Sequence, residues 1–72
     1  MNRYSMIVEW SDEDQLFLVT IPEFADLVVM PCTCGKNRSE AIHHGEEVIE
    51  MYLEAWLAEG VAIPEPKTLQ VA

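Results

Sequence analysis

Residues 37–60, NRSEAIHHGEEVIEMYLEAWLAEG, predict one long amphipathic helix around which the rest of the fold can pack. Asn37 is a preferred N-cap residue, because its side-chain oxygen can accept from an unpaired backbone N–H of the first turn. Glu40 follows three residues later and can complete a variant of the capping box. Gly60 can adopt the left-handed conformation that ends a helix, and Pro64 prevents the helix from resuming.

Apolar and small residues recur along this helix at steps of three and four, which places them on one face. They are Ala41, Ile42, Gly45, Val48, Ile49, Tyr52, Leu53, Ala55 and Trp56. Glu47, Glu50 and Glu54 fall on the opposite face. At about 1.5 Å per residue the helix would be roughly 33 Å long, which is enough to cover a small sheet.

Three apolar segments precede the helix, and their alternating or β-forming residues predict strands over residues 4–10, 15–21 and 27–33. The polar residues 11–14 (SDED) suit a tight hairpin between the first two strands. Pro22 ends the second strand, because proline has no N–H to donate to a ladder. Pro31 places the third strand at an edge of the sheet or around a bulge.

The segment after the helix predicts a fourth strand. Residues 61–66 (VAIPEP) are expected to be extended, and residues 67–71 (KTLQV) alternate, with Leu69 and Val71 on one face. Two pairings are open for this strand: with the sheet of its own subunit, or with the edge of a neighbour's sheet. The order β-β-β-α-β predicts an α+β fold, a single domain over residues 1–72, with an antiparallel sheet and one helix packed on one face.

The composition is strongly acidic, with thirteen Asp and Glu residues against four Lys and Arg, a net charge of −9 and a pI near 4.3. Such a chain repels a phosphate backbone, so we expect no direct binding of nucleic acid. It either attracts a basic partner or is kept soluble by its charge. Half of the residues are hydrophobic, which is generous for 72 residues and predicts a homo-oligomer, dimer or tetramer. The absence of a leader or of a long apolar run predicts a soluble cytoplasmic protein that does not enter the membrane.

Two groups of residues could carry chemistry, and for each we favour a structural role. Cys32 and Cys34 with His43 or His44 contain ligand types that zinc prefers, but adjacent helical histidines point about 100° apart. Buried cysteines usually behave as small hydrophobes, so we expect no metal and no cofactor. The acidic residues 12–14 are ordinary turn formers rather than ligands of a two-metal nuclease site, so we expect no enzymatic activity.

Several strings in this chain resemble the HicB-like antitoxins. The opening is similar over residues 7–11 (IVEWS) and 17–23 (FLVTIPE), and residues 35–41 (GKNRSEA) resemble the family's G-x-T/S-x-E-E-A helix start. Residues 50–54 (EMYLE) and 60–66 (GVAIPEP) resemble its helix end and the stretch that follows. The chain departs from the pattern at residues 24–27 (FADL), where the family usually has a Pro-Gly-Cys-like corner.

The resemblance implies a partial RNase H-like fold and a function. HicB-like antitoxins neutralise a small basic HicA-type mRNA interferase by covering its RNA-binding surface and active-site histidine. Many members also carry a C-terminal DNA-binding domain, and we expect this chain to be a short form that lacks it. The alternative is an orphan homo-oligomeric HicB-like regulatory or interaction protein that has no toxin partner.

We predict two contact surfaces. The residues expected to contact the toxin are Asp12, Glu13, Asp14, Glu23 and Asp26. The residues expected to form the oligomer interface are Val28, Met30, Leu69 and Val71. The first set is acidic and would meet a basic partner, whereas the second would bring together apolar strand edges.

Overall fold

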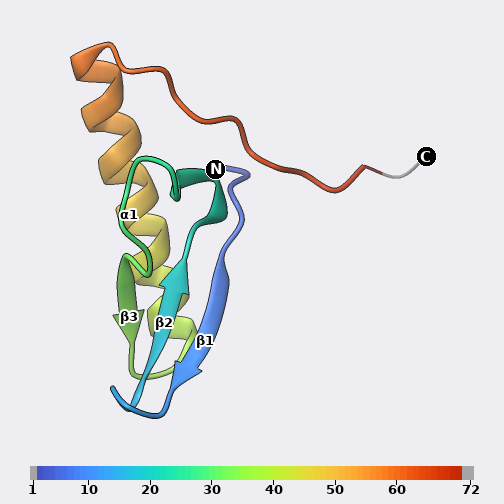
Figure 1. Ribbon diagram of the computed structural model, residues 1–72, viewed down its shortest axis with the longest axis vertical. Helices are drawn as coiled ribbons and strands as arrows, with labels where there is room; N and C mark the ends of the chain where they lie inside the picture. The colour runs from blue at the N-terminus through green and yellow to red at the C-terminus, as the bar shows by residue number, and fades with distance from the viewer. Residues whose placement is uncertain (1, 71–72) are drawn as a thin grey trace.

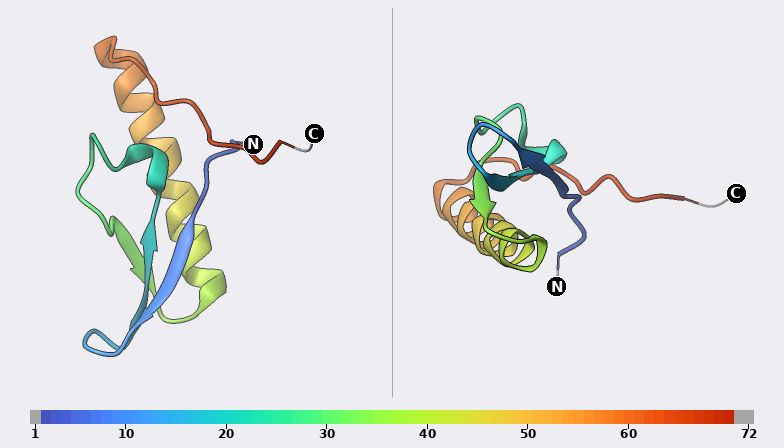
Figure 2. Two further views of the ribbon diagram at one scale, coloured as in Figure 1. Left: turned by 45° about the vertical axis from the view of Figure 1, so that its right-hand side comes forward. Right: turned by 90° about the horizontal axis from the view of Figure 1, so that it is seen from below.

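The computed structural model describes residues 2–70, and the structural statements below refer to this part of the chain (Figure 1). The elements in order are β1 (Ile7–Ser11), β2 (Leu16–Thr20), the short 3₁₀ helix η1 (Pro22–Phe24), β3 (Thr33–Gly35) and α1 (Arg38–Glu59). The strands form one antiparallel sheet in the order β1-β2-β3, and α1 lies across one face of it (Figure 2). The predicted α+β fold with an antiparallel sheet and one long helix is confirmed.

Helix α1 begins and ends where the sequence predicts. The Asn37 side chain accepts from the Glu40 N–H at 2.8 Å. At the other end Gly60 adopts a φ of 73°, in the left-handed region, and its N–H bonds to the carbonyls of Trp56 and Leu57. The reciprocal bond of a capping box, from the Asn37 N–H to the Glu40 side chain, is not formed within residues 2–70.

The first two strands form the predicted hairpin, in a register that runs from Ile7 opposite Thr20 to Ser11 opposite Leu16. Residues 12–15 make the connection, and Gln15 closes it with a positive φ of 55° and an N–H bond to the Ser11 carbonyl. Strand β1 begins three residues later than the predicted residue 4. The preceding backbone leaves the ladder because the Ser5 N–H donates to the Glu23 carboxylate instead of to a strand.

The predicted third strand over residues 27–33 is wrong, since only Thr33–Gly35 pair with β2. Leu27 and Val28 close a turn, with both N–H groups donating to the Phe24 carbonyl at 3.0 and 2.8 Å. Pro31 has no N–H to offer a ladder. The apolar character of this segment reflects partial burial of Val28, Met30 and Cys32 against the core, and its backbone meets β2 only from Cys32 onward, where the Cys32 N–H donates to the Val19 carbonyl at 3.0 Å.

The core lies between the sheet and α1, and its fully buried members are Val19, Ile21, Phe24, Ala41 and Ile49. Phe24 is central, with its ring 4.8 Å from those of Tyr4 and Trp56 in edge-to-face geometry. The buried face of α1 is narrower than predicted, because Ile42 is about half exposed and Ala55 is exposed. The helix therefore leaves a broad outer surface.

Residues 61–70, called the arm below, run extended without strand pairing and project from the body (Figure 1). The predicted last strand over residues 67–71 is therefore not formed over its described part, and Val71 lies outside the described residues. Two hydrogen bonds hold the base of the arm: the Tyr4 hydroxyl donates to the Pro64 carbonyl, and the Lys67 N–H donates to Glu23 at 2.9 Å. Ile63 adds an apolar contact by packing against the core. No helix in residues 2–70 has the length and apolar character needed to cross a membrane.

Candidate partner-binding surface

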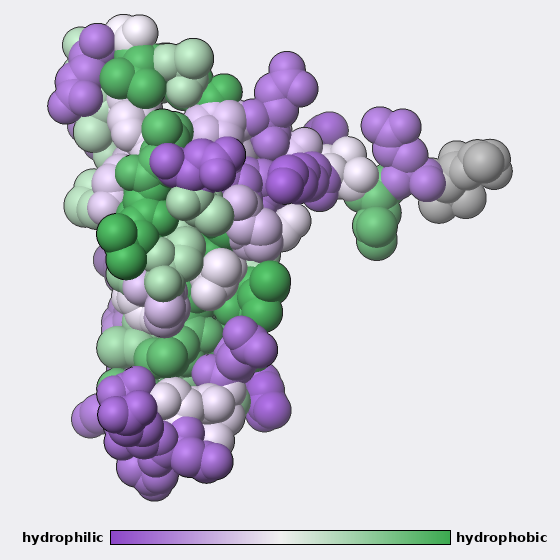
Figure 3. All heavy atoms as spheres, in the orientation of Figure 1, coloured by the Kyte–Doolittle hydropathy of each residue, from purple (hydrophilic) through white to green (hydrophobic). Residues whose placement is uncertain are grey.

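The β1–β2 hairpin tip carries three of the predicted toxin-contact residues, Asp12, Glu13 and Asp14, and all three are exposed. Two of their carboxylates are held in place: the Trp10 indole N–H donates to Asp12 at 2.8 Å, and the Ser11 hydroxyl donates to Asp14 at 2.9 Å. Figure 3 shows hydrophilic side chains gathered at this end of the molecule. The tip is therefore an exposed acidic cluster whose geometry is partly fixed in advance.

The fold places positive charge at the same end of the molecule. The connection from β3 to α1 lies at the same end of the molecule as the hairpin tip (Figure 2), and it carries Lys36 and leads into Arg38. The Arg38 guanidinium lies 4.8 Å from the centre of the Phe17 ring, an arrangement in which a cation is attracted to an aromatic face. Two basic side chains therefore lie at the same end of the molecule as the three acidic residues of the tip.

The remaining predicted contact residues do not join the tip. Because β2 runs the length of the sheet between residues 14 and 22, Glu23 and Asp26 lie at the opposite end. Asp26 is exposed, whereas Glu23 is buried and accepts from the Ser5 N–H, the Ser5 hydroxyl and the Lys67 N–H. The structure thus gives Glu23 a structural role, and we omit it from the surface proposed below.

The charge of Glu23 is maintained despite its burial. Burial by itself would raise the pKa of this carboxyl group. The backbone N–H groups of Lys67, Glu23 and Ser5, with the Ser5 hydroxyl, outweigh that effect and hold the pKa of Glu23 below its ordinary value. A buried, ionised carboxylate therefore joins η1, the N-terminal segment and the base of the arm.

The outer face of α1 carries a second acidic surface, made by the glutamates that were predicted to lie opposite the apolar face and were not among the predicted contact residues. Glu47, Glu50 and Glu54 are all exposed, and their spacing of three and four residues keeps them on one stripe. His43 lies 3.7 Å from Glu47, and there is no Lys or Arg between residues 39 and 66. The sequence features that indicate this acidic surface are the spacing of the glutamates and the long stretch that contains no basic residue.

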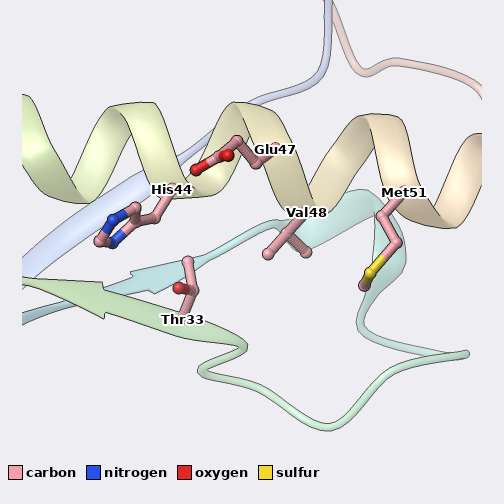
Figure 4. Close-up of a pocket in the computed structure, with 5 residues that line it drawn as sticks. All are labelled: Thr33, His44, Glu47, Val48 and Met51. Carbon is pink, nitrogen blue, oxygen red and sulfur yellow. The ribbon is translucent and has the colours of Figure 1, made fainter.

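A shallow hollow of about 380 Å³ lies between β3 and α1, lined by Thr33, His44, Glu47, Val48 and Met51 (Figure 4). The His44 Nδ1 atom lies 2.6 Å from the Cys34 carbonyl oxygen. Because a carbonyl can only accept, the Nδ1 atom must carry the proton in this bond. His44 therefore fastens the helix to β3, which is a structural use of this residue.

The cysteines and histidines do not assemble a metal site in the described part of the chain. No group of three or more His, Cys, Asp or Glu side chains with suitable geometry occurs in residues 2–70. The Cys32 thiol lies half-buried beside the Val19 carbonyl, and burial raises its pKa, which favours the neutral thiol over the metal-binding thiolate. The zinc interpretation gains no support from this arrangement.

The predicted oligomer residues occupy two different environments. Val28 and Met30 are half-buried against the core, and the Met30 sulfur accepts from the Ile21 N–H at 3.5 Å. Leu69 is fully exposed on the arm. A role of these residues in subunit contact stays a prediction, and Leu69 is the member that the fold leaves free to make one.

Comparison of the chain with protein-family models, with curated proteins and with solved structures finds no match in any of the three. The likeness to HicB-like antitoxins therefore rests on the quoted strings alone. The class that fold and surface define is a small α+β domain with an acidic helix face.

Proposed function

We propose that the chain is an antitoxin-type binding module that neutralises a small basic HicA-like mRNA interferase by protein–protein contact and performs no chemistry itself. Three lines support this proposal: the strings that resemble HicB-like antitoxins, an α+β fold compatible with that resemblance, and the acidic surface. The partial RNase H-like relationship is part of the same proposal.

The observation that carries the proposal is the placement of the acidic side chains. An enzyme that cleaves mRNA must bind a phosphate backbone, and such surfaces are lined by Lys and Arg. The stripe of Glu47, Glu50 and Glu54 presents exposed carboxylates on a rigid helix, where they can compete with RNA for a basic groove. The hairpin tip (Asp12, Glu13 and Asp14) and Asp26 would add contacts at the ends of the sheet.

Recovery of the partner from the native host tests this function. The chain, tagged at its N-terminus so that the arm stays free, is used as bait, and the bound proteins are identified by mass spectrometry. The matched bait is the E47Q/E50Q/E54Q variant, which has the same fold with three fewer negative charges. The expected result is a small basic protein, recovered at near-equal stoichiometry by the wild type and less by the variant. Recovery of no basic protein under conditions that preserve tight complexes would contradict the proposal.

A further inference from the structure

The sheet has two free edges, and the structure protects them unequally. Strand β3 is only three residues long, and its Cys34 carbonyl is already bonded by the His44 ring. Strand β1 has five residues, and within residues 2–70 its backbone bonds go only to β2 and to the hairpin turn. Short strands and side-chain bonds are ways to block an edge, so β3 is closed to a further strand and β1 is open.

The arm has the properties of a strand that lacks a partner. Its last described residues, Thr68 to Gln70, make no hydrogen bond within residues 2–70, and the Leu69 side chain is as exposed as in an extended peptide. The arm leaves the body on the side where β1 forms the edge of the sheet (Figures 1 and 2). Full burial of a leucine is worth roughly 1.5–3 kcal/mol, so packing of the Leu69 side chain against another surface would be favourable.

The arm and β1 are complementary in sequence. Along β1, Ile7 and Glu9 are two residues apart and both exposed, on the sheet face that α1 does not cover. In the arm, Lys67 and Leu69 are also two residues apart and therefore share a face. In an antiparallel register Lys67 stands opposite Glu9 and Leu69 opposite Ile7, so an ion pair and an apolar pair form together. A parallel register cannot give both pairs. When Lys67 stands opposite Glu9 in that register, Leu69 lies on the far side of Glu9 from Ile7.

We propose that two copies of this chain exchange arms, with residues 67–70 of each copy adding as an antiparallel strand to the free edge of β1 in the other. The contact is isologous, so each copy gives one arm and receives one. Pro64 and Pro66 confine the added strand to the residues from Lys67 onward. The Lys67 N–H bonds to Glu23 beside Ser5, which places Lys67 away from Glu9 of its own chain, so the antiparallel register requires the β1 strand of a second copy.

The arm exchange goes beyond the proposed antitoxin function and does not depend on it. It requires only the chain itself, and the occupant of the β1 edge is a second copy because the complementary pattern lies in the same sequence. Each copy carries a net charge of −9, so like-charge repulsion opposes the dimer and added salt relieves it. Binding of a basic toxin has the opposite dependence, since salt screens the attraction between the partners.

The test is the molar mass of the purified full chain, measured by light scattering over a concentration series. The informative variants are K67E, E9K and the double variant E9K/K67E, which restores the opposite pairing at the net charge of the wild type. Glu9 and Lys67 are both exposed, so these changes leave the core intact. We expect the wild type and the double variant to be dimers. Each single variant should raise the dimer dissociation constant about tenfold, because the symmetric contact contains the pair twice.

Two further variants keep the test sharp. T68P removes a donor from the arm and should also give monomers, whereas L57K changes an exposed apolar residue on α1 and should leave the dimer unchanged. A monomeric wild type, or a dimer that resists both K67E and T68P, overturns the arm exchange. If K67E or E9K weakens the dimer and the double variant E9K/K67E does not restore it, the proposed register is also overturned. Because these measurements use the chain alone, their failure leaves toxin binding untouched, and the absence of a toxin leaves them valid.

Discussion

At the scale of single residues, Glu23 shows how far a side chain can depart from its local sequence context. It follows a strand and a proline, which predicted an exposed acidic residue, yet its carboxylate is buried and bonded to Ser5 and Lys67. These partners lie 18 and 44 residues away, so no local pattern could reveal them. The N-cap of Asn37, by contrast, depends on a neighbour three residues away and was predictable.

The lowered pKa of Glu23 predicts a pH dependence of stability. The ionised group stabilises the fold at every pH above its unfolded-state pKa, about 4.3, and this contribution is lost as the pH falls through the lower folded-state value. E23Q should therefore cost about 1–3 kcal/mol of unfolding free energy at pH 7, since hydrogen bonds to a charged acceptor are lost. The difference from the wild type should shrink below about pH 4.

Urea unfolding at both pH values measures this effect, with E65Q, at an exposed position, as the control. Carboxylates titrate between about pH 7 and about pH 3. A difference in unfolding free energy between the wild type and E23Q that stays constant over this range would contradict the assigned role of the charge.

At the scale of elements, α1 and the hairpin were predictable from local sequence features. The conformations of the other segments depend on contacts between residues that are distant in the sequence. Helix caps, periodicity and turn residues act within a few residues, so the sequence reports them directly. Residues 27–33 were predicted as a strand because they are apolar, but the Leu27 and Val28 N–H groups close a turn on the Phe24 carbonyl. The predicted strand over residues 67–71 alternates, but its described part, residues 67–70, pairs with no strand of residues 2–70.

The close packing around α1 predicts opposite outcomes for alanine substitution at two glycines, Gly35 at the end of β3 and Gly45 within α1. A Cβ atom at Gly35 would lie 2.3 Å from the backbone nitrogen of Ala41, so the helix itself would have to shift. A Cβ atom at Gly45 would lie 2.8 Å from the Met6 sulfur, which is the flexible end of a side chain. G35A should therefore cost about 2 kcal/mol or more. G45A should be near neutral, because a gain in helix propensity of about 1 kcal/mol offsets the adjustment. Thermal unfolding of the two variants checks this, and a G35A protein as stable as G45A would refute the packing described.

Either of two acidic surfaces, the helix stripe or the hairpin tip, could provide the main contact with a partner. Variants that remove charge from one surface at a time distinguish between them. E47Q/E50Q/E54Q on α1 and D12N/E13Q/D14N at the hairpin tip each remove three negative charges from exposed positions. Because Lys36 and Arg38 lie near the tip, we expect the helix variant to slow association with a basic partner more, by about tenfold at low salt. Association rates at low and high salt measure this. A loss that is equal at both salt concentrations would argue against electrostatic recognition.

At the scale of the whole molecule, the chain is a two-layer structure with one covered and one open sheet face (Figure 2). A core this small leaves apolar side chains exposed, among them Ile7, Trp10 and Leu69. The exposed large hydrophobic residues are thus spread over β1, the segment that follows η1, the outer surface of α1 and the arm. The fold class followed from element order, whereas the positions of the open edge and of the arm required the structure.

Cleavage of RNA by the recovered basic protein, measured while this chain is titrated in, is the decisive test of the antitoxin proposal. We expect cleavage to stop near one equivalent of chain per toxin. We also expect E47Q/E50Q/E54Q to require a larger excess at low salt. A basic partner whose RNA cleavage continues unchanged at saturating chain would contradict the antitoxin function, and the acidic helix face would then serve another partner.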